Sequence, residues 1–217
     1  VAVGKEGAQP CLVRSNLFFC GLPRFSEDLD FTLFETNPDF KLKPYFATVK
    51  QVLDSFGFTV SIEEVRKEQN RRVESAFLKA NTQMHLLKVD ATGALARKVQ
   101  ANKLLNVKFE VDVYPPLGFE TEVKSMLPPL TAAVTVLKSS SLFAGKMHAV
   151  LFREWKGRVK GRDYYDLLWY LGQNIPLRLV YLEQKMKDGD KMPVKAALSR
   201  EEVLRLLKKK ITTLDWV

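Results

Sequence analysis

Alternating apolar and polar residues predict β-strands in the first two thirds of the chain. The clearest run is 107–113, where four apolar residues alternate with Lys108, Glu110 and Asp112. Successive side chains of a strand point to opposite faces, so this run has one apolar and one charged face. Shorter runs of the same kind predict strands over 29–34, 58–65 and 132–137.

Apolar residues at helical spacing predict one helix in the first half of the chain and four after residue 138. The first of them ends before Gly57, a residue typical of a helix C-terminus. The serine run 139–141 is expected to cap the second, and Ser199 with Glu202 three residues later is typical of a capping box. The predicted helices are 42–56, 139–154, 162–172, 177–187 and 199–210.

The order of these elements predicts an α+β fold with a sheet domain followed by a helical domain. Residues 71–105 mix helical and strand-like pieces and predict no single element. The charge also divides the chain: residues through Val123 hold 16 basic and 16 acidic side chains, and the other 94 hold 18 and 9. We therefore expect domains at 1–123 and 124–217. A basic domain favours an anionic partner, nucleic acid or polyphosphate, with a solvated helical surface as the alternative.

The composition is that of a globular protein and argues against several classes. Hydrophobic residues make up 46% of the chain and charged residues 27%. No apolar run is long enough to span a membrane and no signal-peptide pattern is present, so we expect a cytoplasmic protein. Cys11 and Cys20 are too few for a disulfide framework, and together with His85 and His148 they lack the spacing of zinc ligands.

Asp28 and Asp30 form the first candidate site. They lie two residues apart at the start of a predicted strand, so both carboxylates point to the same side. Adjacent carboxylates repel each other unless a cation lies between them, and oxygen ligands suit Mg²⁺. A metal held in this way can bind a triphosphate and stabilise an in-line displacement. The alternative is a pair of ordinary turn residues before a strand.

A third carboxylate is expected from the strand at 107–113. Glu110 and Asp112 share its charged face, so either residue can complete a metal site with the first pair. The pattern does not choose between them. The alternative is the exposed polar face of an edge strand.

A charged block from Lys146 through Arg153 to residues 160–166 is the next candidate site. Lys146 lies in an apolar helix, where a lysine is exposed, snorkelled or paired, and where it can bind a phosphate as a point charge. The surrounding residues do not form a P-loop. Asp163 and Asp166 are neighbours on one helix face. In the first turn, Asp163 alternatively serves to complement the helix dipole.

Three segments together resemble the AbiEii/AbiGii toxin family of nucleotidyltransferases. They are GLPRFSEDLDF, KFEVDVYPPLGFETE and AGKMHAVLFREWKGRVKGRDYYDLLWYL, and the resemblance runs in order from about residue 15 to 172. It implies a nucleotidyltransferase-fold sheet with a helical domain and transfer of a nucleoside monophosphate from a nucleoside triphosphate. Many members of this family are toxins paired with an antitoxin protein, and some add nucleotides to transfer RNA.

The resemblance also implies roles for individual residues. Asp28 and Asp30 match the aspartates that bind the catalytic metal. Lys146 is expected to contact the nucleotide phosphates. Asp163 is expected to be a further active-site residue that orients or deprotonates the acceptor hydroxyl.

One turn departs from the family pattern. The family usually has a Gly-Gly-Thr or Gly-Ser turn before its Asp-x-Asp, and its backbone N–H groups cradle phosphate. Here the same distance falls on residues 13–16, with Gly7 further upstream. Without the glycine, close approach of a phosphate is harder, although Ser15 can still donate its hydroxyl. Arg162 and Asp166 are the other candidates for nucleotide binding.

The hypothesis from the sequence is a Mg²⁺-dependent nucleotidyltransferase with an RNA acceptor, the end of a tRNA, acting as a toxin of a toxin–antitoxin or phage-defence system. The altered turn motivates an alternative from another class, a degenerate member that only binds nucleic acid or an antitoxin protein. A third possibility keeps the chemistry and transfers the nucleotide to a protein or a small molecule, which the basic half of the chain disfavours.

Overall fold

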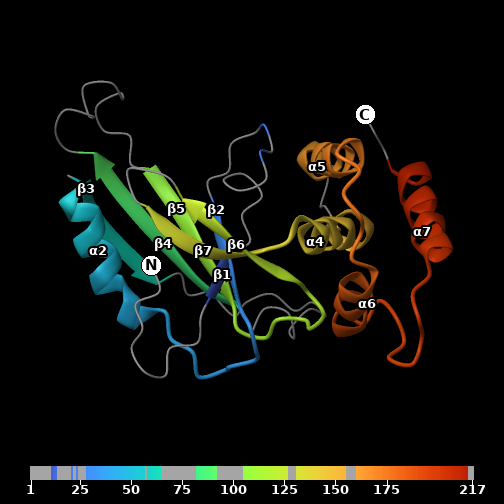
Figure 1. Ribbon diagram of the computed structural model, residues 1–217, viewed down its shortest axis with the longest axis horizontal. Helices are drawn as coiled ribbons and strands as arrows, with labels where there is room; N and C mark the ends of the chain where they lie inside the picture. The colour runs from blue at the N-terminus through green and yellow to red at the C-terminus, as the bar shows by residue number, and fades with distance from the viewer. Residues whose placement is uncertain are drawn as a thin grey trace. The chain divides into compact units, whose positions relative to one another are not determined.

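The chain forms two compact units in the computed structural model (Figure 1). The first consists of Val1–Ser15 and Phe25–Pro115, and the second of Asn16–Arg24 and Pro116–Val217. The structure describes residues 11–13, 21, 23, 28–56, 58–64, 82–91, 105–126, 131–154 and 160–214. No helix within these ranges is both long enough and apolar enough to cross a membrane.

The first unit is built on a mixed β-sheet. Its strands are β1 (Cys11–Val13), β2 (Asp28–Leu33), β3 (Phe58–Glu64), β4 (Thr82–Ala91) and β5 (Leu105–Asp112). They lie in the order β3-β4-β5-β2-β1, with β2 and β5 parallel and the other neighbours antiparallel. The short 3-10 helix η1 (Lys43–Tyr45) leads into α2 (Phe46–Ser55), which packs along β3.

The strands β2 and β5 have one apolar and one polar face. Leu33, Val111 and Val113 are buried together in a core cluster. The alternate positions, which include Asp30 and Glu110, therefore point to the opposite face of the sheet. The structure confirms both of these predicted strands, and β3 and β7 also lie where the sequence places them.

Two features of the first unit go beyond the sequence prediction or differ from it. β4 is a strand in the segment 71–105, where the pattern predicted no single element. The predicted helix 42–56 is divided into η1 and α2, and it ends with Phe56 as the C-cap residue. Gly57, its expected terminator, lies outside the described residues.

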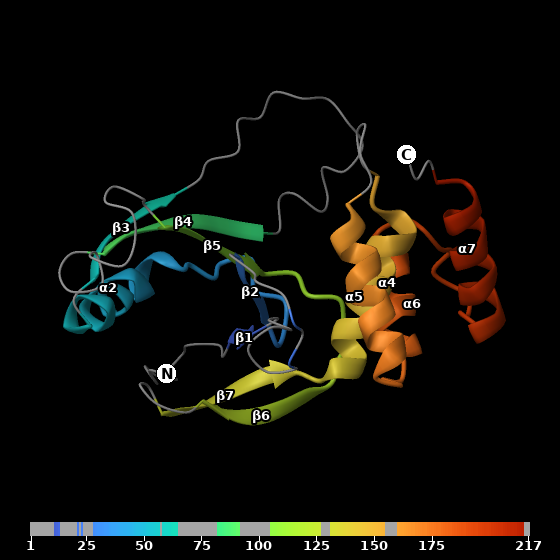
Figure 2. The same ribbon diagram turned by 90° about the horizontal axis from the view of Figure 1, so that it is seen from above.

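The second unit combines a β-hairpin with helices, which confirms the predicted α+β class. Its described elements are β6 (Thr121–Met126), β7 (Ala132–Leu137), α4 (Ser139–Phe152), α5 (Gly161–Gly172), α6 (Leu179–Asp188) and α7 (Arg200–Thr212). β6 and β7 pair antiparallel, and α4 packs against both α5 and α6 (Figure 2). The ring of Phe143 on α4 stacks on that of Tyr170 on α5, with centroids 4.9 Å apart.

The hairpin is joined to the helices by the segment just before β6. The backbone N–H of Glu120 donates to Ser141 Oγ at 2.9 Å, and its carboxylate lies 2.9 Å from Arg178 NH1. The backbone N–H of Lys138 donates to the carbonyl of Glu120, also at 2.9 Å. These contacts explain why the hairpin belongs to the second unit. The domain boundary expected after Val123 falls inside β6.

The two predicted helix caps have different outcomes. Ser199 is the N-cap of α7, and its hydroxyl accepts the backbone N–H of Glu202 at 3.2 Å, which is the serine half of the predicted capping box. The carboxylate of Glu202 binds Arg205 instead. The serine run does not cap α4, because Ser139 is already the first residue of that helix. Its N-cap is Lys138, which makes no side-chain cap bond. A serine caps from the position before the helix, so the earlier start of α4 removes this role.

Replacing Ser199 by alanine is expected to destabilise α7 by about 1 kcal/mol, because the N–H of Glu202 loses its acceptor. Amide hydrogen exchange in the first turn of α7 should become faster, while exchange in α4 stays the same. Ser140→Ala is the matched control, since Ser140 lies within the first turn of α4 and not at its cap. Equal exchange rates in wild type and Ser199→Ala would mean that the cap contributes nothing.

Candidate active site

Carboxylates from β2 and β5 lie on one face of the sheet in the first unit. The parallel register places Asp30 directly opposite Glu110, with Asp112 one pair further along the same face. Adjacent strands are about 4.8 Å apart, so Asp30 and Glu110 are close enough to share a cation. The backbone of Asp28 lies opposite that of Lys108. The side chain of Asp28 lies outside the described part of the structure.

This face fits the way in which proteins bind Mg²⁺. The ion is usually held by one or two protein carboxylates, and water or substrate phosphate completes its octahedron. Asp112 is partly engaged elsewhere, because its Oδ1 accepts the backbone N–H of Tyr114 at 3.1 Å. Among the described side chains no group of three or more His, Cys, Asp or Glu is gathered around a possible metal. Asp30 and Glu110 are the two carboxylates that the β2–β5 register brings opposite each other.

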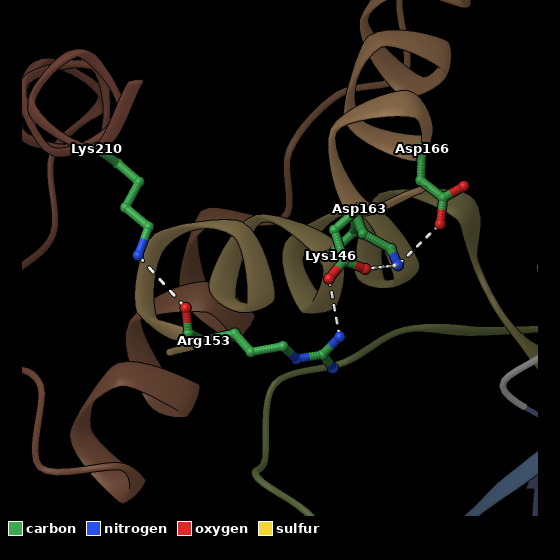
Figure 3. Close-up of polar contacts among 5 residues, drawn as sticks. All are labelled: Lys146, Arg153, Asp163, Asp166 and Lys210. Carbon is green, nitrogen blue, oxygen red and sulfur yellow. Dashed lines mark hydrogen bonds and ion pairs between the residues drawn. The ribbon is translucent and has the colours of Figure 1, made fainter. Parts of the chain in front are cut away.

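A second charged group lies where α4 packs on α5 in the second unit (Figure 3). Lys146 Nζ on α4 is 2.9 Å from Asp163 Oδ1 and 2.8 Å from Asp166 Oδ2, both on α5. Arg153 NH1 is 2.8 Å from the other oxygen of Asp163. Arg153, the C-cap residue of α4, follows Lys146 by seven positions, and the two aspartates are three apart on α5. Each pair therefore lies on one helix face, and the two faces meet.

The two aspartates of this cluster are almost wholly buried. Asp163 is 1% exposed and Asp166 is fully buried, whereas the side chains of Lys146 and Arg153 are 16% and 44% exposed. Burying a carboxylate is unfavourable unless it is paired, and here two cations offset two carboxylates. Asp163 also lies in the first turn of α5, where the helix dipole favours a negative charge.

Two neighbours extend the cluster. Lys210 Nζ on α7 donates to the backbone carbonyl of Arg153 at 3.4 Å, which ties the last helix to the end of α4 (Figure 3). Burial raises the pKa of the Tyr164 hydroxyl, and the negative charge of Asp163 raises it further. Tyr164 therefore stays protonated near neutral pH and is not a base.

The remaining predicted residues have different positions. Arg162 is exposed at the start of α5, and Asp166 is buried against Lys146. Ser15 and the rest of the altered turn after β1 lie outside the described residues. Sequence reasoning assigned no role to Arg153. The signal that could have identified it is its position seven residues after Lys146, two helical turns along the same face.

His148 is another titratable group for which the sequence suggested no role. It lies on α4, with its ring centroid 5.1 Å from that of Phe152. Its Nε2 has no hydrogen-bond partner among the described residues. Burial, and then the positive charges of Lys185, Lys191 and Arg153, lower the pKa of His148 from 6.5 to about 4. The imidazole is therefore neutral near pH 7 and resists protonation.

The free energy of unfolding is expected to fall as the pH is lowered from 6.5 to about 4. In this range the unfolded chain binds a proton at His148 that the folded chain does not, so protons favour unfolding, and the effect levels off below pH 4. The difference between the two pKa values corresponds to about 3 kcal/mol at most. Urea unfolding between pH 7 and 4 should show the loss in the wild type and a flatter profile in His148→Leu. An equal loss of unfolding free energy in the two proteins would contradict the assignment of this pH dependence to His148.

Comparisons with known proteins confirm the resemblance seen in the sequence. Residues 16–217 match the family model described as "Nucleotidyl transferase AbiEii toxin, Type IV TA system". Among solved structures, the chain is similar to a crystal structure described as a "putative nucleotidyltransferase from H. pylori". That similarity has 16% identity and a TM-score of 0.47, and it covers 94% of this chain and 86% of the other. No curated protein matches the chain.

Proposed function

Since the chain belongs to the AbiEii family, the nucleotidyl transferase toxins of type IV toxin–antitoxin systems, we propose that it transfers a nucleoside monophosphate from a nucleoside triphosphate to an RNA, with tRNA as the acceptor. In this reaction an acceptor hydroxyl oxygen bonds to the α-phosphorus and releases its proton to the solvent. The bond from that phosphorus to the bridging oxygen breaks, and pyrophosphate leaves. The family implies an antitoxin partner. The register of Asp30 with Glu110 is the observation that carries the proposal.

We assign Mg²⁺ as the cofactor and Asp30, Glu110 and Asp28 as the residues that would hold it. When bound, the ion would neutralise phosphate charge and stabilise an in-line displacement. Glu110 is favoured over Asp112 as the third carboxylate because it lies directly opposite Asp30 in the strand register.

Two cations, Lys146 on α4 and Arg153 at the C-cap of that helix, are the candidates for binding the triphosphate. Asp163 contacts both. Both oxygens of Asp163 are engaged and its side chain is buried. To accept a proton from an acceptor hydroxyl it would have to break an ion pair, so an orienting role is favoured over that of a general base.

The charge of the C-terminal part of the chain supports RNA as the acceptor. The last 94 residues hold 18 basic and 9 acidic side chains. Exposed basic residues include Arg162 on α5 and Lys208 and Lys209 on α7. Side chains of this kind bind the phosphates of nucleic acids and release counterions as they do so. A small uncharged acceptor would not need such a surface.

The proposal is tested with purified protein, total RNA, Mg²⁺ and each of the four α-labelled nucleoside triphosphates in turn. We expect label on an RNA band of tRNA size, lost when Mg²⁺ is chelated and absent in Asp28→Ala. Label on protein instead of RNA would support a nucleotidyltransferase whose acceptor is a protein. No label from any nucleotide would contradict the proposal and favour a binding protein whose altered turn at 13–16 has cost it the activity.

A further inference from the structure

Lys146 lies in surroundings that do not favour a phosphate. Its Nζ is 2.9 Å and 2.8 Å from oxygens of Asp163 and Asp166, and its side chain is 16% exposed. An ammonium group has three N–H donors, and two of them are directed at carboxylates here. Arg153 balances the second carboxylate, so the four charges of the cluster sum to zero. A triphosphate approaching Nζ would have to displace an aspartate.

Arg153 differs from Lys146 in its exposure and in its unused donors. Its side chain is 44% exposed, and among the described residues its guanidinium is engaged through NH1, at 2.8 Å from Asp163 Oδ2. Figure 3 shows the second terminal nitrogen turned away from that carboxylate. The residue is the C-cap of α4 with extended backbone (φ −70°, ψ 125°), so the chain leaves the helix there. A guanidinium anchored along one edge and exposed along another is suited to binding a phosphate through parallel hydrogen bonds.

We propose that Arg153 contacts the phosphates that leave as pyrophosphate, and that Lys146 is a positioning residue that holds Asp163 and Asp166. Asp163 links the two cations, because one of its oxygens binds Lys146 and the other orients Arg153. Negative charge develops on the departing pyrophosphate, where a fixed cation is most effective. The assignment rests on the proposed transfer from a nucleoside triphosphate, and it replaces the expectation that Lys146 binds the phosphates.

Arg153→Gln tests this assignment, because the charge and both terminal nitrogens of the guanidinium are lost while Asp163 keeps its ion pair with Lys146. We expect the KM for the nucleoside triphosphate and the Kd of magnesium pyrophosphate each to rise about 10- to 100-fold. The thermal midpoint should stay near that of the wild type. Arg153→Lys should recover part of the loss, since an ammonium keeps the charge without the fork geometry.

Arg205→Gln is the matched control, because Arg205 is an exposed arginine of the same unit that is paired with Glu202 on α7. It should leave KM and Kd unchanged. A purely structural role of Arg153 would instead lower kcat and the thermal midpoint together without weakening pyrophosphate binding, and that result would overturn the inference. Lys146→Met, measured below its melting temperature, should weaken pyrophosphate binding less than Arg153→Gln does. A larger loss of pyrophosphate binding in Lys146→Met than in Arg153→Gln would also overturn the inference.

Pyrophosphate binding is measured by calorimetry in the presence of Mg²⁺ and needs no RNA, so it separates this inference from the proposed acceptor. If the wild type binds pyrophosphate and Arg153→Gln binds it weakly, the inference is supported even when no RNA is labelled. If the wild type labels RNA and Arg153→Gln keeps its KM and Kd, the inference fails and the proposed function stands. A wild-type protein that binds neither pyrophosphate nor nucleotide overturns both.

Discussion

Replacing Asp30 by asparagine is expected to reduce nucleotide transfer at least about a thousandfold, because the site loses a ligand of its metal and with it the stabilisation of the charge on the phosphates. Initial rates of label transfer over a range of Mg²⁺ concentrations measure the effect. The thermal midpoint should not fall, since the substitution removes one of two carboxylates that lie opposite each other in the β2–β5 register. Loss of activity without loss of stability identifies a functional carboxylate.

Comparison of two further variants separates the candidates for the third carboxylate. Glu110→Gln is expected to lower the rate more than Asp112→Asn, because Glu110 lies directly opposite Asp30 in the register and Asp112 lies opposite Thr32. Asp39→Asn, at an exposed position of the same unit, is the control and should be fully active. Full activity of Asp30→Asn, or a larger loss in Asp112→Asn than in Glu110→Gln, would refute this metal site.

Strands with one buried face are the elements that the sequence predicts best. In β5, Val111 is buried and the residues on either side of it are charged, so the alternation follows directly from the two environments of the sheet. β2 likewise has one buried face, because Leu33 is buried and follows the two aspartates at the start of the strand. The confirmed helices of the second unit likewise have buried faces at helical spacing, such as Tyr181, Leu182 and Met186 on α6.

Strands that depend on distant partners were not predictable in this way. β4 contains adjacent Leu86 and Leu87, which break the alternation, and it forms between β3 and β5. In β6, the apolar residue Val123 is 68% exposed. Apolar and polar residues therefore do not alternate between a buried and an exposed face in this strand. This strand exists because it pairs with β7 across a hairpin. Such strands are determined by pairing with other segments more than by their own residues.

The candidate site shows the same division between local and distant information. Alternation within β5 predicted that Glu110 and Asp112 share a face, but the choice between them depends on the register with β2, which a local pattern does not contain. On α4, the sequence left Lys146 exposed, snorkelled or paired. The pairing with Asp163 and Asp166 depends on how α4 packs against α5, so the partners became known only from the structure.

Replacing Lys146 by methionine is expected to lower the free energy of unfolding by about 3 kcal/mol, because two buried carboxylates lose the cation that they share. For a chain of this length the loss corresponds to a fall of roughly 10 °C in the thermal midpoint. Methionine retains most of the length of the lysine side chain, so packing changes little. Calorimetry or thermal unfolding followed by circular dichroism measures the shift. A midpoint within a degree or two of the wild type would mean that the cluster contributes little to stability.

The double variant Lys146→Met/Asp166→Asn is the control that isolates charge from packing. It removes one positive and one negative charge and leaves the ion pair of Arg153 with Asp163 in place. Replacing a buried ion pair by neutral groups of similar size is often nearly neutral in stability, so the double variant should be more stable than Lys146→Met alone. If the two variants have the same thermal midpoint, the loss of stability arises from the methionine side chain and not from an uncompensated carboxylate. Nucleotide transfer should remain low in both, because stability is regained without the lysine that positions Asp163 and, through it, Arg153.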